Sequence, residues 1–271
     1  MKKILLALFL TVAIFSCKKE SDDNEQTIET PVLAGDTVDV ALISSKWIIA
    51  NNEEFKSIEF NESGNYIIVK TPKLKAATTT DDEVLYGTYT IVNETTIILS
   101  GFGTVIFIDF GQEITKIVIT LATNPTSPIT LEATEKSEIT MTTKTELLCR
   151  TWDLYTVNGE EVAGTTDEST VLFSAAGTYF VDFADPEMDE YGGLAQWSWS
   201  SSLQQSFCYD WETTPVCSST NSVSIVSLTE TELKVSEDGT IFIFKPATSN
   251  KSRTLTLCDS TNILKNGFLK R

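Results

Sequence analysis

Short apolar runs separated by turn-forming residues dominate the chain after about residue 43. Runs rich in Ile, Val, Thr, Phe and Tyr alternate with Gly, Asn, Ser and Asp, a pattern that is typical of antiparallel β-strands. In Lys116–Leu121, for example, Ile117 and Ile119 share one face of an extended chain. Thr240–Lys245 is apolar on both faces and predicts a strand covered on both sides. We therefore expect an all-β protein.

Two places depart from regular alternation. At Val223–Leu228 the apolar positions change phase between Ile225 and Val226, which one extra residue in the strand, a β-bulge, would explain. Thr143–Leu148 is compatible with a short helical turn between the two halves of the chain. Sustained helical periodicity is otherwise missing after the first segment of the sequence.

The two halves share a repeated pattern. Phe60–Tyr66 and Phe173–Tyr179 both have the form Phe-x-x-x-Gly-x-Tyr, which predicts a strand end, a turn with a left-handed glycine and a new strand. Three further features follow the same order in each half. A tryptophan precedes the motif (Trp47 and Trp152), an aromatic strand follows it (Tyr86–Tyr89 and Trp197–Trp199), and an apolar strand comes later (Ile117–Leu121 and Val223–Leu228). We expect two tandem copies of one β-domain, at 43–142 and 146–271.

This order of features resembles the lipocalin-like domains of Bacteroidetes lipoproteins. The second half also carries Leu228–Leu233, a Leu-Thr-x-Thr-x-Leu element of that pattern, whereas the first half has Leu121-Ala-Thr-Asn-Pro at the corresponding place. The resemblance implies two antiparallel up-and-down barrels or half-barrels of about eight strands, each able to enclose a small ligand at its mouth.

The first sixteen residues have the pattern of a signal peptide. Lys2 and Lys3 precede an almost unbroken apolar run, Ile4–Phe15, which is too short to span a bilayer. Ser16 and Cys17 follow. This arrangement resembles the lipobox of bacterial lipoproteins, in which a peptidase cuts before a cysteine that receives acyl chains. An ordinary secretory signal that contains a cysteine is the alternative.

Residues 17–42 are expected to form a flexible tether, because their polar, turn-forming composition cannot bury enough apolar surface to offset the entropy of ordering. The acid-rich stretch Lys18–Asp23 resembles the surface-export signal of Bacteroidetes lipoproteins. Together with the lipobox, it implies an outer-membrane lipoprotein that is held by acyl chains on Cys17, with palmitate among them, and faces the cell exterior.

The chain is strongly acidic. Removing the signal leaves 18 basic against 38 acidic residues, a formal net charge of −20. Such a surface repels phosphate backbones and anionic lipid, so nucleic acid is excluded as a partner and membrane attachment depends on the anchor.

Four cysteines besides Cys17 remain, all of them in the second half. The favoured pairs are Cys208–Cys217 across a short loop and Cys149–Cys258 between the ends of that half. Reduced thiols are the main alternative in an exported chain. A metal site is disfavoured, because no C-x-x-C spacing and no histidine are present.

No catalytic motif is apparent, and the absence of histidine removes the commonest general base. The densest acidic run, Val181–Tyr191, has the composition of a solvated loop. Two of its carboxylates could in principle serve a glycosidase, and Asp185, Glu187 and Asp189 are weak calcium candidates, but a plain acidic loop is the simpler interpretation. We expect no enzyme activity and no cofactor.

Aromatic residues of the second half form the other candidate site. Trp197 and Trp199 share a strand face and are expected in the barrel core. Tyr209 and Trp211, which flank Asp210, lie between Cys208 and Cys217 and are candidates for stacking on a sugar ring or docking on a protein; folding back over the barrel end is the alternative. The leading hypothesis is a binding module for an extracellular small molecule or glycan. The alternative is a non-catalytic structural or protein-interaction component of the envelope.

Overall fold

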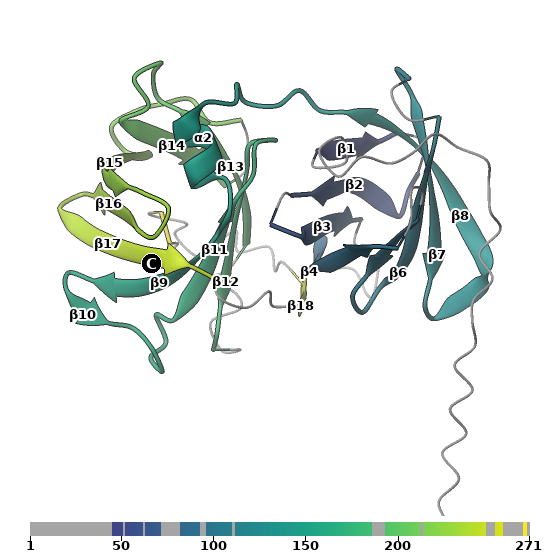
Figure 1. Ribbon diagram of the computed structural model, residues 1–271, viewed down its shortest axis with the longest axis horizontal. Helices are drawn as coiled ribbons and strands as arrows, with labels where there is room; N and C mark the ends of the chain where they lie inside the picture. The colour runs from purple at the N-terminus through teal and green to yellow at the C-terminus, as the bar shows by residue number, and fades with distance from the viewer. Residues whose placement is uncertain are drawn as a thin grey trace, which may run out of the picture. The chain divides into compact units, whose positions relative to one another are not determined.

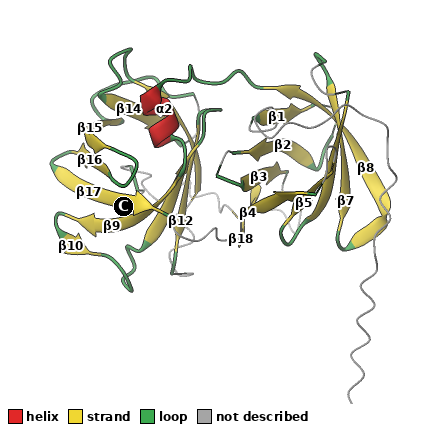
Figure 2. Ribbon diagram, viewed as in Figure 1, coloured by secondary structure: helices red, strands yellow, loops and turns green. Residues whose placement is uncertain are grey.

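The computed structural model describes residues 45–50, 52–61, 63–71, 82–92, 96–109, 112–185, 193–211, 214–247, 253–256 and 268–269. These residues belong to one compact unit, Leu33–Arg271. They form two antiparallel β-barrels, which confirms the expected all-β architecture (Figures 1 and 2). Cys17, the signal and the tether up to residue 42 lie outside the described residues and stay predictions. In the described part of the chain, no helix is long and apolar enough to cross a membrane.

The first barrel is a closed up-and-down meander. Each strand pairs with the next one along the chain, and the first strand closes on the last. Its strands are β1 (Lys46–Ile49), β2 (Phe55–Phe60), β3 (Asn65–Lys70), β4 (Glu83–Ile91), β5 (Thr96–Leu99), β6 (Gly103–Ile108), β7 (Thr115–Leu121) and β8 (Asn124–Glu135). A strand from the far end of the chain, β18 (Arg253–Thr256), pairs with β4 of this barrel. The second domain as expected, 146–271, therefore contributes a strand to the sheet of the first.

The second barrel repeats this topology and closes between β9 and β17. It is preceded by the helix α2 (Thr143–Leu148), which confirms the expected helical turn. Its strands are β9 (Thr151–Val157), β11 (Ser169–Phe173), β12 (Thr178–Phe183), β13 (Gly193–Trp199), β14 (Ser206–Asp210), β15 (Ser222–Leu228), β16 (Leu233–Glu237) and β17 (Thr240–Pro246), with the two-residue β10 (Glu160–Glu161) paired to β9.

The repeated motif adopts the same turn twice. Gly64 and Gly177 have φ values of 81° and 80°, a conformation that glycine adopts without steric cost. In each copy the glycine carbonyl accepts a hydrogen bond from the aromatic strand that follows, from the N–H of Tyr89 in the first barrel and from that of Trp197 in the second. The left-handed glycine and the aromatic strand were both predicted correctly.

Two sequence expectations need correction. The pairing of Ile117–Leu121 with Val223–Leu228 is displaced by one strand, because the former lies in β7, the seventh strand of its barrel, whereas β15 is the sixth of the other. Strand β17 is fully covered on one face, where Phe242 and Phe244 are buried, and only partly covered on the other, where Ile241 and Ile243 are half-buried. The predicted bulge in β15 is present, as a register shift between Ile225 and Ser227.

Each barrel has its own apolar core. Inward-facing side chains of the strands fill the first barrel, where Trp47 and Phe60 both pack against Phe107, with ring centroids 5.4 and 5.8 Å from it. The second barrel is lined by the equivalent strand positions, including Trp197, as predicted, and α2 contributes the fully buried Leu148.

Candidate binding site in the second barrel

The side chain of Phe268, which belongs to no strand, lies inside the second barrel. It is fully buried, and its ring stacks on Tyr179 with centroids 5.0 Å apart and an interplanar angle of 11°. Five more strand aromatics surround it at centroid distances of 5.5–6.3 Å: Phe173, Phe207, Tyr209, Phe242 and Phe244. The following residue, Leu269, is buried in the same core. The second barrel thus has an interior built around a residue from outside its wall.

Both backbone polar groups of Phe268 are bonded to side chains of the barrel. Its N–H donates to Oε2 of Glu237 at 2.8 Å, and its carbonyl oxygen accepts from the hydroxyl of Tyr179, also at 2.8 Å. Buried backbone groups that lack a partner are costly, so these two contacts are what allow a peptide unit to occupy an apolar interior. We call the set of Tyr179, Tyr209, Glu237 and Phe268 the Phe268 site.

Glu237 is the acidic centre of this site. It follows Leu233 and Val235 on the inward face of β16, and its Oε1 accepts a hydrogen bond from the hydroxyl of Tyr209 at 2.6 Å. Burial raises the pKa of the Glu237 carboxyl, while the hydrogen bonds from Tyr209 and the Phe268 N–H act in the opposite direction. Burial likewise raises the pKa of the Tyr179 phenol, with Glu237 adding to the effect.

The first barrel provides an internal comparison. Tyr66 is the counterpart of Tyr179 in the repeated motif, and its hydroxyl donates to the Ser100 carbonyl at 2.7 Å, at the end of a strand of the same barrel. Tyr66 packs near Phe102, and Tyr179 packs near Trp211 in the corresponding connection. Among the described residues, Phe268 has no equivalent in the first barrel. The two barrels share their strand topology and the motif tyrosine, and they differ in that a residue from outside the strands, Phe268, lies inside the second.

The aromatic residues singled out in the sequence do not form an exposed loop. Tyr209 belongs to β14 and is 4% exposed, because it continues the inward face that Phe207 begins. Trp211 packs partly against the same core, with its ring 6.2 Å from Tyr209. Asp210, on the opposite side of β14, is half-buried. Tyr209 therefore cannot stack on a sugar at the surface, and the arrangement is the one in which the aromatics fold back into the barrel.

One expected disulfide is present. Cys208 and Cys217 are joined, with their Cα atoms 5.3 Å apart. Cys208 is fully buried on the face of β14 opposite to Tyr209, so the bridge fixes the following loop against the outer side of the wall. Cys149 ends α2 and is half-buried, while Cys258 lies outside the described residues. The second pairing stays a prediction.

The acidic run is only partly a loop. Asp182 lies in β12 and is 2% exposed, which corrects the interpretation of this residue as solvated. Asp185 follows the strand, whereas Glu187 and Asp189 lie outside the described residues, so the calcium hypothesis is not tested. Within the described ranges, no three acidic or cysteine side chains come together as a metal site would require.

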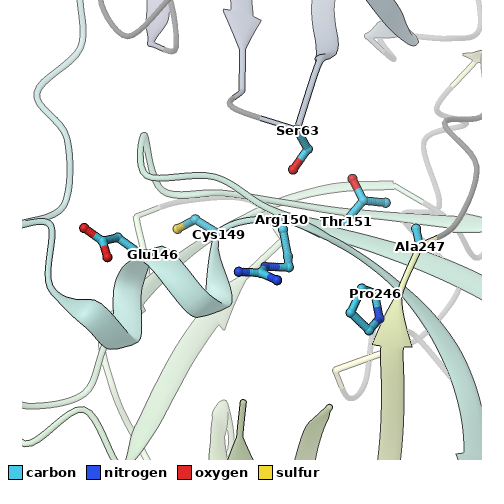
Figure 3. A pocket seen from close by; sticks show the side chains of 7 residues that line it. All are labelled: Ser63, Glu146, Cys149, Arg150, Thr151, Pro246 and Ala247. Atoms are coloured by element: carbon cyan, nitrogen blue, oxygen red, sulfur yellow. The ribbon is translucent and has the colours of Figure 1, made fainter. Parts of the chain in front are cut away.

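A surface groove lies beside α2. It has a volume of about 330 Å³ and is lined by Ser63, Glu146, Cys149, Arg150, Thr151, Pro246 and Ala247 (Figure 3). Its cation is already engaged, since Arg150 lies over the ring of Trp152 and donates to the Glu230 carbonyl. The groove is open and has no aromatic lining, so it lacks the apolar enclosure of a small-molecule site.

A scan of the chain against protein-family models finds no match, and a search of curated proteins finds no relative.

Sequence reasoning missed Glu237 and Phe268. Glu237 could have been found, because a carboxylate at the inward position of an alternating strand, after Leu233 and Val235, is unusual. For Phe268 the only signal is that Phe268 and Leu269, like Ile263 and Leu264 before them, are large apolar residues within a mostly polar end of the chain.

Proposed function

We propose that this protein is a lipoprotein of the outer membrane, anchored through Cys17 and facing the cell exterior, whose second barrel is a binding module for a small extracellular ligand with an apolar ring. One observation carries the binding role. The centre of this barrel is occupied by Phe268, a residue that is not part of the wall and can be exchanged for another occupant without unpairing a strand. The proposed role is non-catalytic.

The lining agrees with such a ligand. Aromatic rings surround the occupant on several sides, and two polar side chains, Tyr179 and Glu237, converge on it. Binding sites for small molecules have this character, mainly apolar with a few polar groups that fix orientation. A glycan would require many more hydrogen-bonding partners than this interior offers, so the small molecule is favoured over the sugar.

The alternative is a structural or protein-interaction component of the envelope. It is favoured by the first barrel, which is filled by side chains of its own strands. It is also favoured by the apolar contact between the outer walls of the two barrels, where the rings of Tyr86 and Phe180 lie 5.0 Å apart. A pair of closed barrels joined in this way would suit a spacer.

Native mass spectrometry of the mature protein from its own host's envelope distinguishes the two. We would compare the wild type with Phe268→Ala, which removes the internal occupant, and with Phe60→Ala, which removes an equally buried ring from a strand of the first barrel. A binding module should carry extra mass that is lost on denaturation, at higher occupancy in Phe268→Ala than in the other two. If none of the folded proteins carries such a mass, the spacer role stands and the binding role is rejected.

A further inference from the structure

The Phe268 site contacts its occupant through three chemically distinct features. Tyr179 and the surrounding aromatics pack against the ring of Phe268. The Glu237 carboxylate accepts from the Phe268 N–H at 2.8 Å, and the Tyr179 hydroxyl donates to the Phe268 carbonyl at 2.8 Å. A hydrocarbon of the same size would satisfy only the first. It would leave an oxygen of the half-buried Glu237 carboxylate and the buried Tyr179 phenol without these partners, which weakens binding.

Glu237 and Tyr179 match the backbone N–H and carbonyl of a single residue in direction as well as in type. An acceptor faces the nitrogen of the residue, and a donor faces its carbonyl, on the two sides of the same Cα. Strand pairing does not provide these contacts, because Phe268 lies in no strand and its partners are side chains. The barrel therefore recognises one residue of a chain in a non-extended, side-chain-mediated way, which differs from addition of a strand to a sheet edge.

Glu237 is held in position independently of the occupant. Its other oxygen accepts from the Tyr209 hydroxyl at 2.6 Å, and the Tyr209 ring lies 6.1 Å from that of Phe268. The acceptor is thus fixed by the wall before any occupant arrives. Such pre-organisation lowers the entropic cost of binding.

We infer that the second barrel recognises a phenylalanine residue within a peptide chain, and that Phe268 is a built-in competitor for that peptide. This inference rests on the proposed binding role and specifies the class of ligand. It predicts that an added peptide binds when the internal ring is removed. Because a tethered competitor acts at an effective concentration of roughly millimolar, the wild type should bind the same peptide at least about tenfold more weakly.

The test is a calorimetric titration of the full-length mature protein carrying Phe268→Ala. The probe is an N-acetylated, C-amidated peptide with the sequence of residues 266–270, Asn-Gly-Phe-Leu-Lys, and its control has Ala in place of Phe. A second probe, propylbenzene, offers a ring without a peptide unit. Circular dichroism checks that the variant is folded; if it is not, the wild type is titrated at higher peptide concentrations, where we expect binding at least about tenfold weaker than to a vacated site.

Adding Tyr179→Phe to the Phe268→Ala protein removes only the donor to the carbonyl. We expect the peptide affinity to fall roughly tenfold, and the propylbenzene affinity to stay the same. Tyr66→Phe is the matched control, because it removes the equivalent hydroxyl in the first barrel. It should leave both affinities unchanged.

The titrations distinguish recognition of a peptide from the proposed binding of a small ligand with an apolar ring. Binding of the Phe peptide but not of the Ala peptide, sensitive to Tyr179→Phe, supports a peptide site. Binding of propylbenzene without binding of the peptide overturns the peptide class and leaves a small-molecule barrel. Binding of neither probe to a folded variant overturns both.

Discussion

Replacing Phe268 with Ala should loosen the end of the chain from the second barrel. The ring is fully buried, and comparable Phe→Ala changes in protein cores cost about 3–5 kcal/mol. What then holds this end of the chain is the buried side chain of Leu269 and a pair of hydrogen bonds, from the N–H of residue 268 to Glu237 and from Tyr179 to its carbonyl. The side chain contributes about 1.5–3 kcal/mol and the two hydrogen bonds together about 2–4 kcal/mol. Ordering each residue costs roughly 1–2 kcal/mol, so a segment of about five residues gains little free energy by staying bound.

The same change in a strand has a different consequence. Phe60 is buried to the same degree, but its backbone is paired within β2 and cannot leave the first barrel without breaking the sheet. We expect both Phe60→Ala and Phe268→Ala to lower the free energy of unfolding by about 3–5 kcal/mol. Only Phe268→Ala should expose the end of the chain.

Hydrogen exchange measured together with urea unfolding separates these cases. In the wild type the amide of Phe268 should be protected, since the residue is fully buried and its N–H is bonded to the Glu237 carboxylate. In Phe268→Ala the peptide containing position 268 should exchange within the dead time, while the strands of the second barrel keep their protection. The reasoning is refuted if protection at 268 survives, or if the loss of stability is below about 1 kcal/mol.

Three further predictions concern the second barrel. Gly177→Ala should destabilise by about 1–2 kcal/mol in chemical denaturation, because its φ is positive and a Cβ would lie 3.2 Å from the Trp197 carbonyl oxygen. Reducing the Cys208–Cys217 bridge should cost about 2–3 kcal/mol, as expected for a loop with a sequence separation of 9, and an unchanged melting temperature in reductant would contradict this. Since burial raises the pKa of Glu237, its contribution to stability should be complete below about pH 4.5 and lost as the pH rises through the raised value. Stability curves of Glu237→Gln should therefore be flatter with pH than those of the wild type.

Local features of the fold were predictable because each depends on a few neighbouring residues. The left-handed turns at Gly64 and Gly177, the bulge after Ile225 and the bridge from Cys208 to Cys217 each leave a mark in a short window of sequence. The existence of two tandem copies followed from the repeated motif, whereas the number of strands was implied by the resemblance to lipocalin-like domains. These inferences required no knowledge of what lies across the barrel.

The candidate site was not predictable in the same way. Tyr209 was assigned to a loop because it lies between Cys208 and Cys217 with Pro215 close by, whereas the strand continues through it and places it on the same inward face as Phe207. The predicted equivalence of β7 and β15 was wrong, because the alternation of apolar and polar residues within a strand does not reveal how many strands precede it. Phe268 reaches the interior from a distant part of the chain, and no local periodicity encodes such a contact.

The two barrels differ at one point that bears on function. Tyr66 and Tyr179 occupy equivalent positions and each donates to a backbone carbonyl, but the carbonyl belongs to Ser100 of the wall in one case and to Phe268 in the other. A barrel that serves only as a spacer would complete itself from its own strands, as the first does. The second places a half-buried carboxylate, Glu237, where an amide from outside the wall donates to it. The second oxygen of this half-buried carboxylate is satisfied best by an occupant that brings an N–H group, either its own chain or a ligand that replaces it.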